Sequence, residues 1–222
     1  MRMMLRIGSS IRLRLLGWMV CCALPLVYGC GKVRPDPTVK SLDFSTAKSW
    51  DFDQEIIQLD GLSELSADVA EKFAACSGAI YLNGLRGVDD STATALAKTP
   101  AQLEMSGLEA LDSPELAEKL AQQKDVVFLD KLQSISPRVA KALSRNRSGI
   151  TLNGLVELPE EIAKELASHQ GRLWLGSVQA LPDATIKVLL AHESPIYFRD
   201  LKNLSKKGAA VIEKKWGFTV RE

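Results

Sequence analysis

Histidine offers the most direct route to chemistry in this chain, because an imidazole ring can bind a metal or accept a proton. The chain has two histidines, His169 and His192, separated by about 23 residues, the period of an internal repeat. A zinc site needs three or four protein ligands, and no cysteine or acidic residue recurs at a spacing that completes this pair. We therefore interpret the pair as a surface residue repeated at the ends of two helices, where positive charge is mildly favourable, rather than as a metal site or a base.

Cys76 is the one cysteine that follows Cys30. It occupies the same repeated position as the two histidines, just after an expected helix. We expect a buried or half-buried thiol there. No intramolecular disulfide can form if Cys30 is modified.

The sequence contains no motif that assigns a reaction. It has no glycine-rich phosphate loop, no zinc-protease helix and no nucleophile elbow. Its acidic residues, such as Glu160, Glu161 and Glu165, are scattered over expected helix faces, where solvated carboxylates are ordinary. An enzyme needs a base beside a nucleophile in a shared cleft, and no pair of residues suggests one. We predict a protein that is not an enzyme and uses no cofactor.

A column of aromatic residues is the strongest sign of a binding surface. Each of its residues lies between two apolar residues of an expected strand, and four of the seven are aromatic although aromatics make up 6% of the chain. The column is Gln58, Tyr81, Glu104, Phe128, Thr151, Trp174 and Tyr197. Two residues further on, on the same side of each strand, come Asp60, Asn83, Ser106, Asp130, Asn153, Gly176 and Arg199.

Aromatic residues with polar neighbours on an open sheet face suit a protein or glycan partner. We therefore predict a binding surface, the strand-face stripe, formed by Tyr81, Phe128, Trp174, Tyr197, Asn83, Asp130, Asn153 and Arg199. The alternative is that aromatics simply favour strands and pack on one another across them, without a partner.

The elements that position this stripe belong to an internal repeat. One apolar position recurs with a period of about 23 residues, as Leu59, Leu82, Met105, Leu129, Leu152, Leu175 and Phe198. Apolar residues alternate around it, which predicts a strand with one buried face. Further along each repeat, the apolar residues are three or four positions apart, which predicts a short helix. The step from Met105 to Leu129 is longer by a single residue, which falls between Leu111 and Ala117, in the turn from strand to helix.

Turn and helix signals agree with this division. Ser113-Pro114 and Ser136-Pro137 are typical of an N-cap followed by proline in the first helical position. Gly78 and Gly171 stand where a helix would end. A glycine also recurs beside the strand, at Gly61, Gly84, Gly107 and Gly154, where we expect a left-handed or tightly packed backbone.

The pattern resembles a bacterial leucine-rich repeat. The helical half, with Leu158, Ala163 and Leu166-Ala167, is similar to the subclass whose repeats end in Gly-Ala-x-x-Leu-Ala, and Gly208-Ala209 supplies the first two letters of that signature. The resemblance covers about residues 56–217 and implies an α/β solenoid of about seven strand-turn-helix units, with parallel strands on one face and short helices on the other. One departure is that Leu62 and its equivalents stand where the family has a buried asparagine or cysteine, so we expect no asparagine ladder.

The N-terminus predicts export. Four arginines precede an uncharged stretch, and Val27-Tyr28-Gly29-Cys30 resembles a lipobox, in which a signal peptidase cuts before a cysteine that receives lipid. We interpret residues 1–29 as a signal peptide and Cys30 as the lipidation site. The alternatives are plain cleavage and a transmembrane anchor, for which the stretch is short. Without residues 1–29 the chain has 24 basic and 27 acidic residues, a net charge of −3 that argues against nucleic acid as the partner.

The rest of the chain divides into four segments. Residues 30–38 form the lipidated cysteine and an extended tether, 39–55 an N-terminal cap, 56–213 the repeats and 214–222 a C-terminal cap. Composition, with 46% apolar and 25% charged residues, is that of a globular chain. Together these features predict a lipoprotein of the cell envelope, anchored in the cell membrane or outer membrane, which faces the periplasm or the exterior and binds a protein or glycan. A structural spacer without a ligand is the alternative, and an envelope hydrolase a remote one.

Replacing Cys30 tests the predicted anchor. Cys30→Ser removes the thiol that would receive lipid, so the precursor should stay uncut by the lipoprotein peptidase and the chain should carry no lipid. Mass measurement and membrane fractionation report both effects. Normal processing with unchanged membrane association would favour a transmembrane or peripheral anchor.

Overall fold

The computed structural model describes residues 35–217, so the predicted signal peptide, Cys30 and residues 218–222 lie outside the described part. The fold is α/β with parallel strands in two sheets. The first sheet contains β1 (Ile56–Gln58), β2 (Ala79–Tyr81) and β3 (Gln102–Glu104). The second contains β4 (Val127–Phe128), β5 (Gly149–Thr151), β6 (Arg172–Trp174) and β7 (Ile196–Tyr197). In both sheets the strand order follows the chain order.

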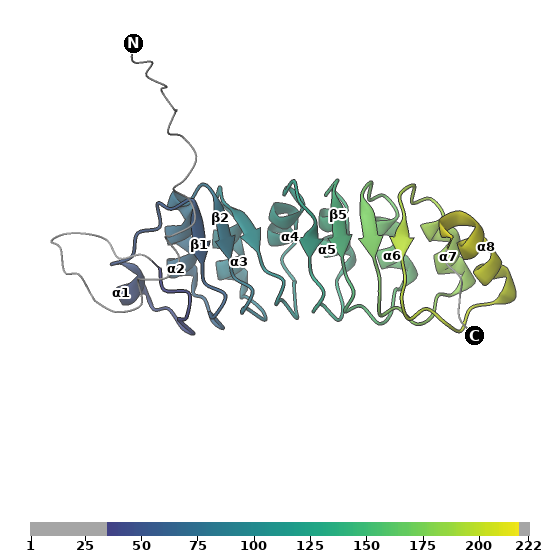
Figure 1. Ribbon diagram of the computed structural model, residues 1–222, viewed down its shortest axis with the longest axis horizontal. Helices are drawn as coiled ribbons and strands as arrows, with labels where there is room; N and C mark the ends of the chain where they lie inside the picture. The colour runs from purple at the N-terminus through teal and green to yellow at the C-terminus, as the bar shows by residue number, and fades with distance from the viewer. Residues whose placement is uncertain (1–34, 218–222) are drawn as a thin grey trace, which may run out of the picture. The chain divides into compact units, whose positions relative to one another are not determined.

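A helix follows every strand, and the helices lie on one side of the strands (Figure 1). They are α2 (Ala67–Ala70) with the 3-10 helix η1 (Glu71–Ala75), α3 (Asp90–Ala97), α4 (Pro114–Ala121), α5 (Pro137–Leu143), α6 (Glu160–Leu166), α7 (Asp183–Leu189) and α8 (Lys206–Trp216). The helix α1 (Phe44–Ala47) precedes the first strand. Within residues 35–217 no helix is long and apolar enough to cross a membrane.

The strand register confirms the predicted columns. Ile57 pairs with Ile80 and Ile80 with Leu103, so each residue of the column meets its equivalent in the next unit. The apolar columns of the strands and the helices are buried in one continuous core that contains Leu59, Leu82, Leu152 and Leu175. The helix starts are also confirmed, because Ser113 and Ser136 accept hydrogen bonds from the main-chain N–H groups of Leu116 and Val139.

The sheet is interrupted between β3 and β4, at the one longer step of the repeat. The Gln123 side chain lies at this break, and its Nε2 donates a hydrogen bond of 2.6 Å to the carbonyl oxygen of Leu103. The carbonyl group in the middle of β3 is therefore hydrogen-bonded to a side-chain amide. Helices α3, α4 and α5 remain in contact across the break, so the core continues where the sheet does not.

The N-terminal segment differs from the prediction. Val39, Leu42, Ala47 and Trp50 lie one repeat period before Leu62, Leu65, Ala70 and Phe73, and they pack into the same core. Ser41 forms a parallel bridge with Glu64, and the Ser63 N–H donates to the Lys40 carbonyl oxygen at 2.9 Å. The segment 39–55, predicted as an N-terminal cap before the repeats, therefore follows the spacing of the repeat itself, as a partial unit without its own strand. The spacing of the four apolar residues was the signal that could have revealed it.

The predicted extended tether also differs. Pro37 and Thr38 form a turn, in which the Asp36 carboxylate accepts from the N–H and the hydroxyl of Thr38 at 2.8 and 2.7 Å. At the other end, residues 214–216, predicted as the start of a separate C-terminal cap, belong to helix α8, and the Trp216 ring lies edge-on to Phe198 at 6.3 Å between centroids.

The recurring glycines are required by close packing between units. A Cβ added at Gly84, Gly107 or Gly154 would lie 2.3, 1.9 or 2.5 Å from a carbonyl oxygen of the preceding unit. Their φ angles are not positive, so the expected left-handed backbone is absent at these three positions.

Gly78 and Gly171 do not end helices as predicted. Helix α6 already ends at its C-cap Ala167, in right-handed conformation. A Cβ at Gly78 would lie 1.8 Å from the Glu55 carbonyl oxygen, and one at Gly171 2.7 Å from the Ser148 carbonyl carbon. Both glycines therefore allow one unit to approach the next.

Two glycines provide a matched test of this packing. Gly107→Ala should destabilise the protein by about 1–3 kcal/mol, because the new methyl group must displace main chain. Gly87→Ala, which has no atom within 4 Å of its added Cβ, should change stability by less than about 1 kcal/mol. Chemical denaturation of both variants measures the difference, and equal effects would contradict the close contact.

Candidate functional site

The strand-face stripe points away from the core, as strand alternation predicts. Phe128 and Tyr197 are 46% and 42% exposed, and Tyr81 and Trp174 are partly buried. The apolar residues on either side of each are buried. The structure thus places all four aromatic residues on one face, across both sheets.

Trp174 and Tyr197 form the most ordered part of the stripe. Their rings stack with centroids 5.3 Å apart and planes 17° apart. Trp174 also leans over β5, since a Cβ added to Gly149 would lie 2.9 Å from its Cζ3 atom. Thr151, on the same strand, is only 6% exposed, and its hydroxyl has no hydrogen-bond partner in the described part of the chain. The aromatic pair is therefore held in place by its neighbours before any partner binds.

The polar column beside the aromatics forms a ladder of hydrogen bonds between units. The Asp60 carboxylate accepts from the N–H and Nδ2 of Asn83 at 3.2 and 2.9 Å, and the Asn83 Oδ1 accepts from the N–H and hydroxyl of Ser106 at 2.9 and 2.8 Å. The Asn83 side chain is thus hydrogen-bonded to both the preceding and the following unit. Its amide group stabilises the main chain of these units.

The same ladder repeats in the second half. The Asp130 carboxylate accepts from the N–H and Nδ2 of Asn153 at 3.2 and 2.9 Å, and the Asn153 Oδ1 accepts from the Gly176 N–H at 2.8 Å. The column of Leu62 and Leu85, where the family has an asparagine or cysteine, is apolar and buried, as the sequence indicates. A different polar ladder, which was not predicted, lies one residue after the buried anchors and runs from Asp60 to Ser106 and from Asp130 to Gly176. The signal was visible as the recurrence of Asp and Asn at that position.

Charge is unequal along the stripe. Glu104, in the first sheet, is partly buried, and burial, with smaller contributions from Asp60 and Asp125, raises the pKa of its carboxyl. Arg199, in the last unit, forms an ion pair with Asp200 at 3.1 Å, and hydrogen bonding to Asp200 raises the pKa of its guanidinium. The face is therefore acidic toward β1, whereas the positive charge of Arg199 toward β7 is paired with Asp200.

A second polar column links each helix end to the preceding unit. The Cys76 thiol donates to the Gln54 carbonyl oxygen at 3.1 Å, and the Thr99 hydroxyl to that of Phe73 at 2.9 Å. Asn146 Nδ2 donates to the Gln123 carbonyl oxygen at 3.0 Å. Cys76 is buried, as expected, and burial raises the pKa of its thiol.

The histidines complete this column, and the prediction that they lie on the surface is wrong. His169 and His192 are 2% and 0% exposed, with rings stacked at 5.9 Å between centroids. The His169 nitrogens lie 3.3 Å from the carbonyl oxygens of Ser144 and Arg172. Neither His192 nitrogen has a hydrogen bond of ordinary geometry within the described residues, although the carbonyls of three preceding residues lie near the ring.

Burial dominates the protonation of this pair. It lowers the pKa of both rings, and for His192 the neighbouring His169 lowers the pKa further, while nearby carbonyls act in the opposite direction. Across residues 35–217, no three or more His, Cys, Asp or Glu residues lie close enough to hold a metal ion. The pair is placed to support packing between two units.

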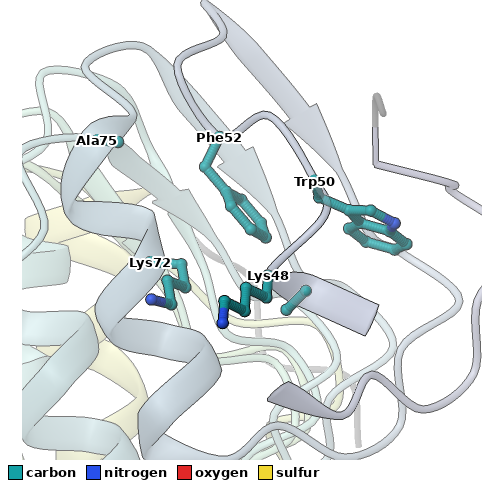
Figure 2. Close-up of a pocket in the computed structure, with 6 residues that line it drawn as sticks. Lys48, Trp50, Phe52, Lys72 and Ala75 are labelled. Carbon is teal, nitrogen blue, oxygen red and sulfur yellow. The ribbon is translucent and has the colours of Figure 1, made fainter. Parts of the chain in front are cut away.

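A small pocket at the N-terminal partial unit was not predicted. Figure 2 shows its lining of Ala47, Lys48, Trp50, Phe52, Lys72 and Ala75, around a volume of about 160 Å³. The Lys72 ammonium lies 4.7 Å from the centre of the Phe44 ring. The two lysines supply the polar side chains of the lining, so the pocket could take a small anion but contains no acid–base pair for a reaction.

Comparison with known proteins does not assign this site. No protein-family model matches the chain, and a search of curated proteins finds no significant match. The function must therefore be argued from the geometry.

The buried histidines predict an acid-sensitive fold. Their pKa values lie below the ordinary value of 6.5 in the folded protein, so only the unfolded chain gains protons as the pH falls through that value. The two histidines should not change the free energy of unfolding above about pH 7. Between pH 7.5 and 5.5 they should lower it by about 1–3 kcal/mol.

The double variant His169→Asn, His192→Asn supplies the control, because Asn146 already occupies the same column. It should lose most of this pH dependence, whatever its stability at neutral pH. Denaturation midpoints at several pH values measure the slope, and an unchanged slope would assign the acid sensitivity to other groups.

Proposed function

We propose that the chain is a leucine-rich-repeat-like solenoid of about seven units, anchored in a bacterial envelope membrane through a lipid on Cys30, whose strand face binds a protein or glycan. It acts as a scaffold rather than as an enzyme. The proposal for the fold is supported by the constant strand register and by the polar ladders, which repeat with the same step. The proposal for the anchor is supported by the lipobox-like sequence ending at Cys30.

The observation that carries the binding proposal is the exposed aromatic surface of the second sheet. Phe128, Trp174 and Tyr197 are the residue types that contribute most to protein interfaces, and aromatic rings also stack on sugars. The stacked pair is fixed by its own stacking and by the packing of Trp174 on Gly149, so little conformational entropy is lost on binding. Most amide groups nearby are engaged in the ladder, which leaves the aromatic rings and Arg199 as the main contact groups.

One observation favours the alternative of a structural spacer. Trp174 packs on Gly149, lies beside Thr151 in the sheet and stacks on Tyr197, so the same residues also stabilise the face itself. Under this alternative, the aromatic column would stiffen the array and no partner would bind. An envelope hydrolase remains a remote alternative, for which the strand face offers no nucleophile beside a base.

The double variant Trp174→Ala, Tyr197→Ala separates these functions. If the stacked pair is the centre of the interface, saturable partner capture by the purified repeat array should weaken by about 2 kcal/mol or more. The fold should tolerate the change, since neither ring fills the core. Binding curves together with thermal unfolding measure both effects.

Phe44→Ala, Val156→Ala is a matched control, because these residues are 44% and 48% exposed and lie outside the stripe. It should leave binding unchanged. Unchanged binding of the stripe variant, with a large loss of stability, would show that the aromatics serve packing. A wild-type array that captures nothing saturable would favour the spacer.

A further inference from the structure

Charge is segregated along the described chain. Residues 35–110 contain thirteen acidic and five basic side chains, a net charge of −8. Residues 196–217, which comprise β7 and α8, contain two acidic and six basic side chains, a net charge of +4. The near-neutral total therefore conceals an acidic first part and a basic last unit.

The basic charge gathers on the last unit as a lysine cluster, defined as Lys202, Lys206, Lys207, Lys214 and Lys215. All five side chains are exposed. Four belong to α8, whose opposite side is buried at Gly208 and Ile212 and contacts α7. Within residues 35–217 none of the five has a carboxylate within ion-pair distance, whereas Arg199 of the same unit pairs with Asp200. The cluster's charge is therefore not neutralised by the chain that the structure describes.

We propose that the lysine cluster is a docking surface for an anionic lipid bilayer. Lysine carries a point charge on a long flexible stem and lacks the planar fork with which arginine recognises a discrete phosphate or carboxylate. Several exposed lysines on one end of a fold suit a diffuse anionic surface, and such clusters are attracted to acidic phospholipid headgroups. The choice of a bilayer over other polyanions rests on the proposed membrane anchorage. The acidic first part is repelled by the same headgroups, so the contact is confined to the last unit.

Vesicle binding tests this surface. The probe is a shortened chain, residues 32–222, which lacks Cys30 and the segment before it. It contains the whole described core, which extends from Val39 to Trp216. It should bind vesicles of phosphatidylglycerol mixed into phosphatidylcholine at low salt and fail to bind pure phosphatidylcholine. Binding should disappear near 1 M salt, where the Debye length is about 3 Å.

Two variants with the same charge change locate the contact. Replacing Lys206, Lys207, Lys214 and Lys215 with Gln should weaken vesicle binding at least tenfold. Replacing Lys124, Lys141, Lys164 and Lys187 with Gln, all exposed in the middle units, should change it less than threefold. Circular dichroism and thermal unfolding establish that both variants are folded.

Three results would overturn the proposal. They are equal binding to the two vesicle types, equal losses in the two variants, and binding to soluble polyphosphate without binding to vesicles. Because this chain carries no Cys30, its failure to bind would leave the acylation test and the strand-face test unaffected.

Discussion

The close approach of successive units is the constraint on which the rest of this structure depends. Parallel strands lie about 4.8 Å apart, and at this distance the turns of neighbouring units nearly touch. A methyl group at Gly84 or Gly107 would collide with a carbonyl oxygen of the preceding unit. Every unit must therefore follow the path of the one before it, and the polar groups of each turn must find their partners in a neighbouring unit.

The two polar columns satisfy these groups. On the strand side, Asp60 and Asn83, and again Asp130 and Asn153, accept from main-chain N–H groups one unit further on. On the helix side, Thr99 and Asn146 donate to carbonyl oxygens of Phe73 and Gln123, near the end of the helix of the preceding unit. Burying the helix-side groups without partners would cost more than their hydrogen bonds gain, so that column stays polar although it lies beside the apolar core, whereas the strand-side column lies on the open face.

The sequence predicts the parts of the fold and of the candidate site that depend on local apolar periodicity. The strands, the capped helix starts and the outward direction of Trp174 follow from alternation or capping within one unit. The burial of His169 and His192 does not, because it depends on the stacking of two units rather than on either segment. Alternation likewise places the polar column on the open face, but it cannot show that Asn83 and Asn153 are already hydrogen-bonded on both sides.

The interruption between β3 and β4 also divides the strand face into two unequal halves. The polar ladder stops at Ser106 and starts again at Asp130, so sheet and ladder break at the same place. The first half carries Tyr81 and the partly buried carboxyl of Glu104, whose raised pKa reflects the cost of holding its charge there. The second half carries the exposed Phe128 and the stacked Trp174 and Tyr197. A rigid apolar contact area therefore exists only in the second half of the described face. A partner that spans both halves must bring positive charge to the first and apolar surface to the second.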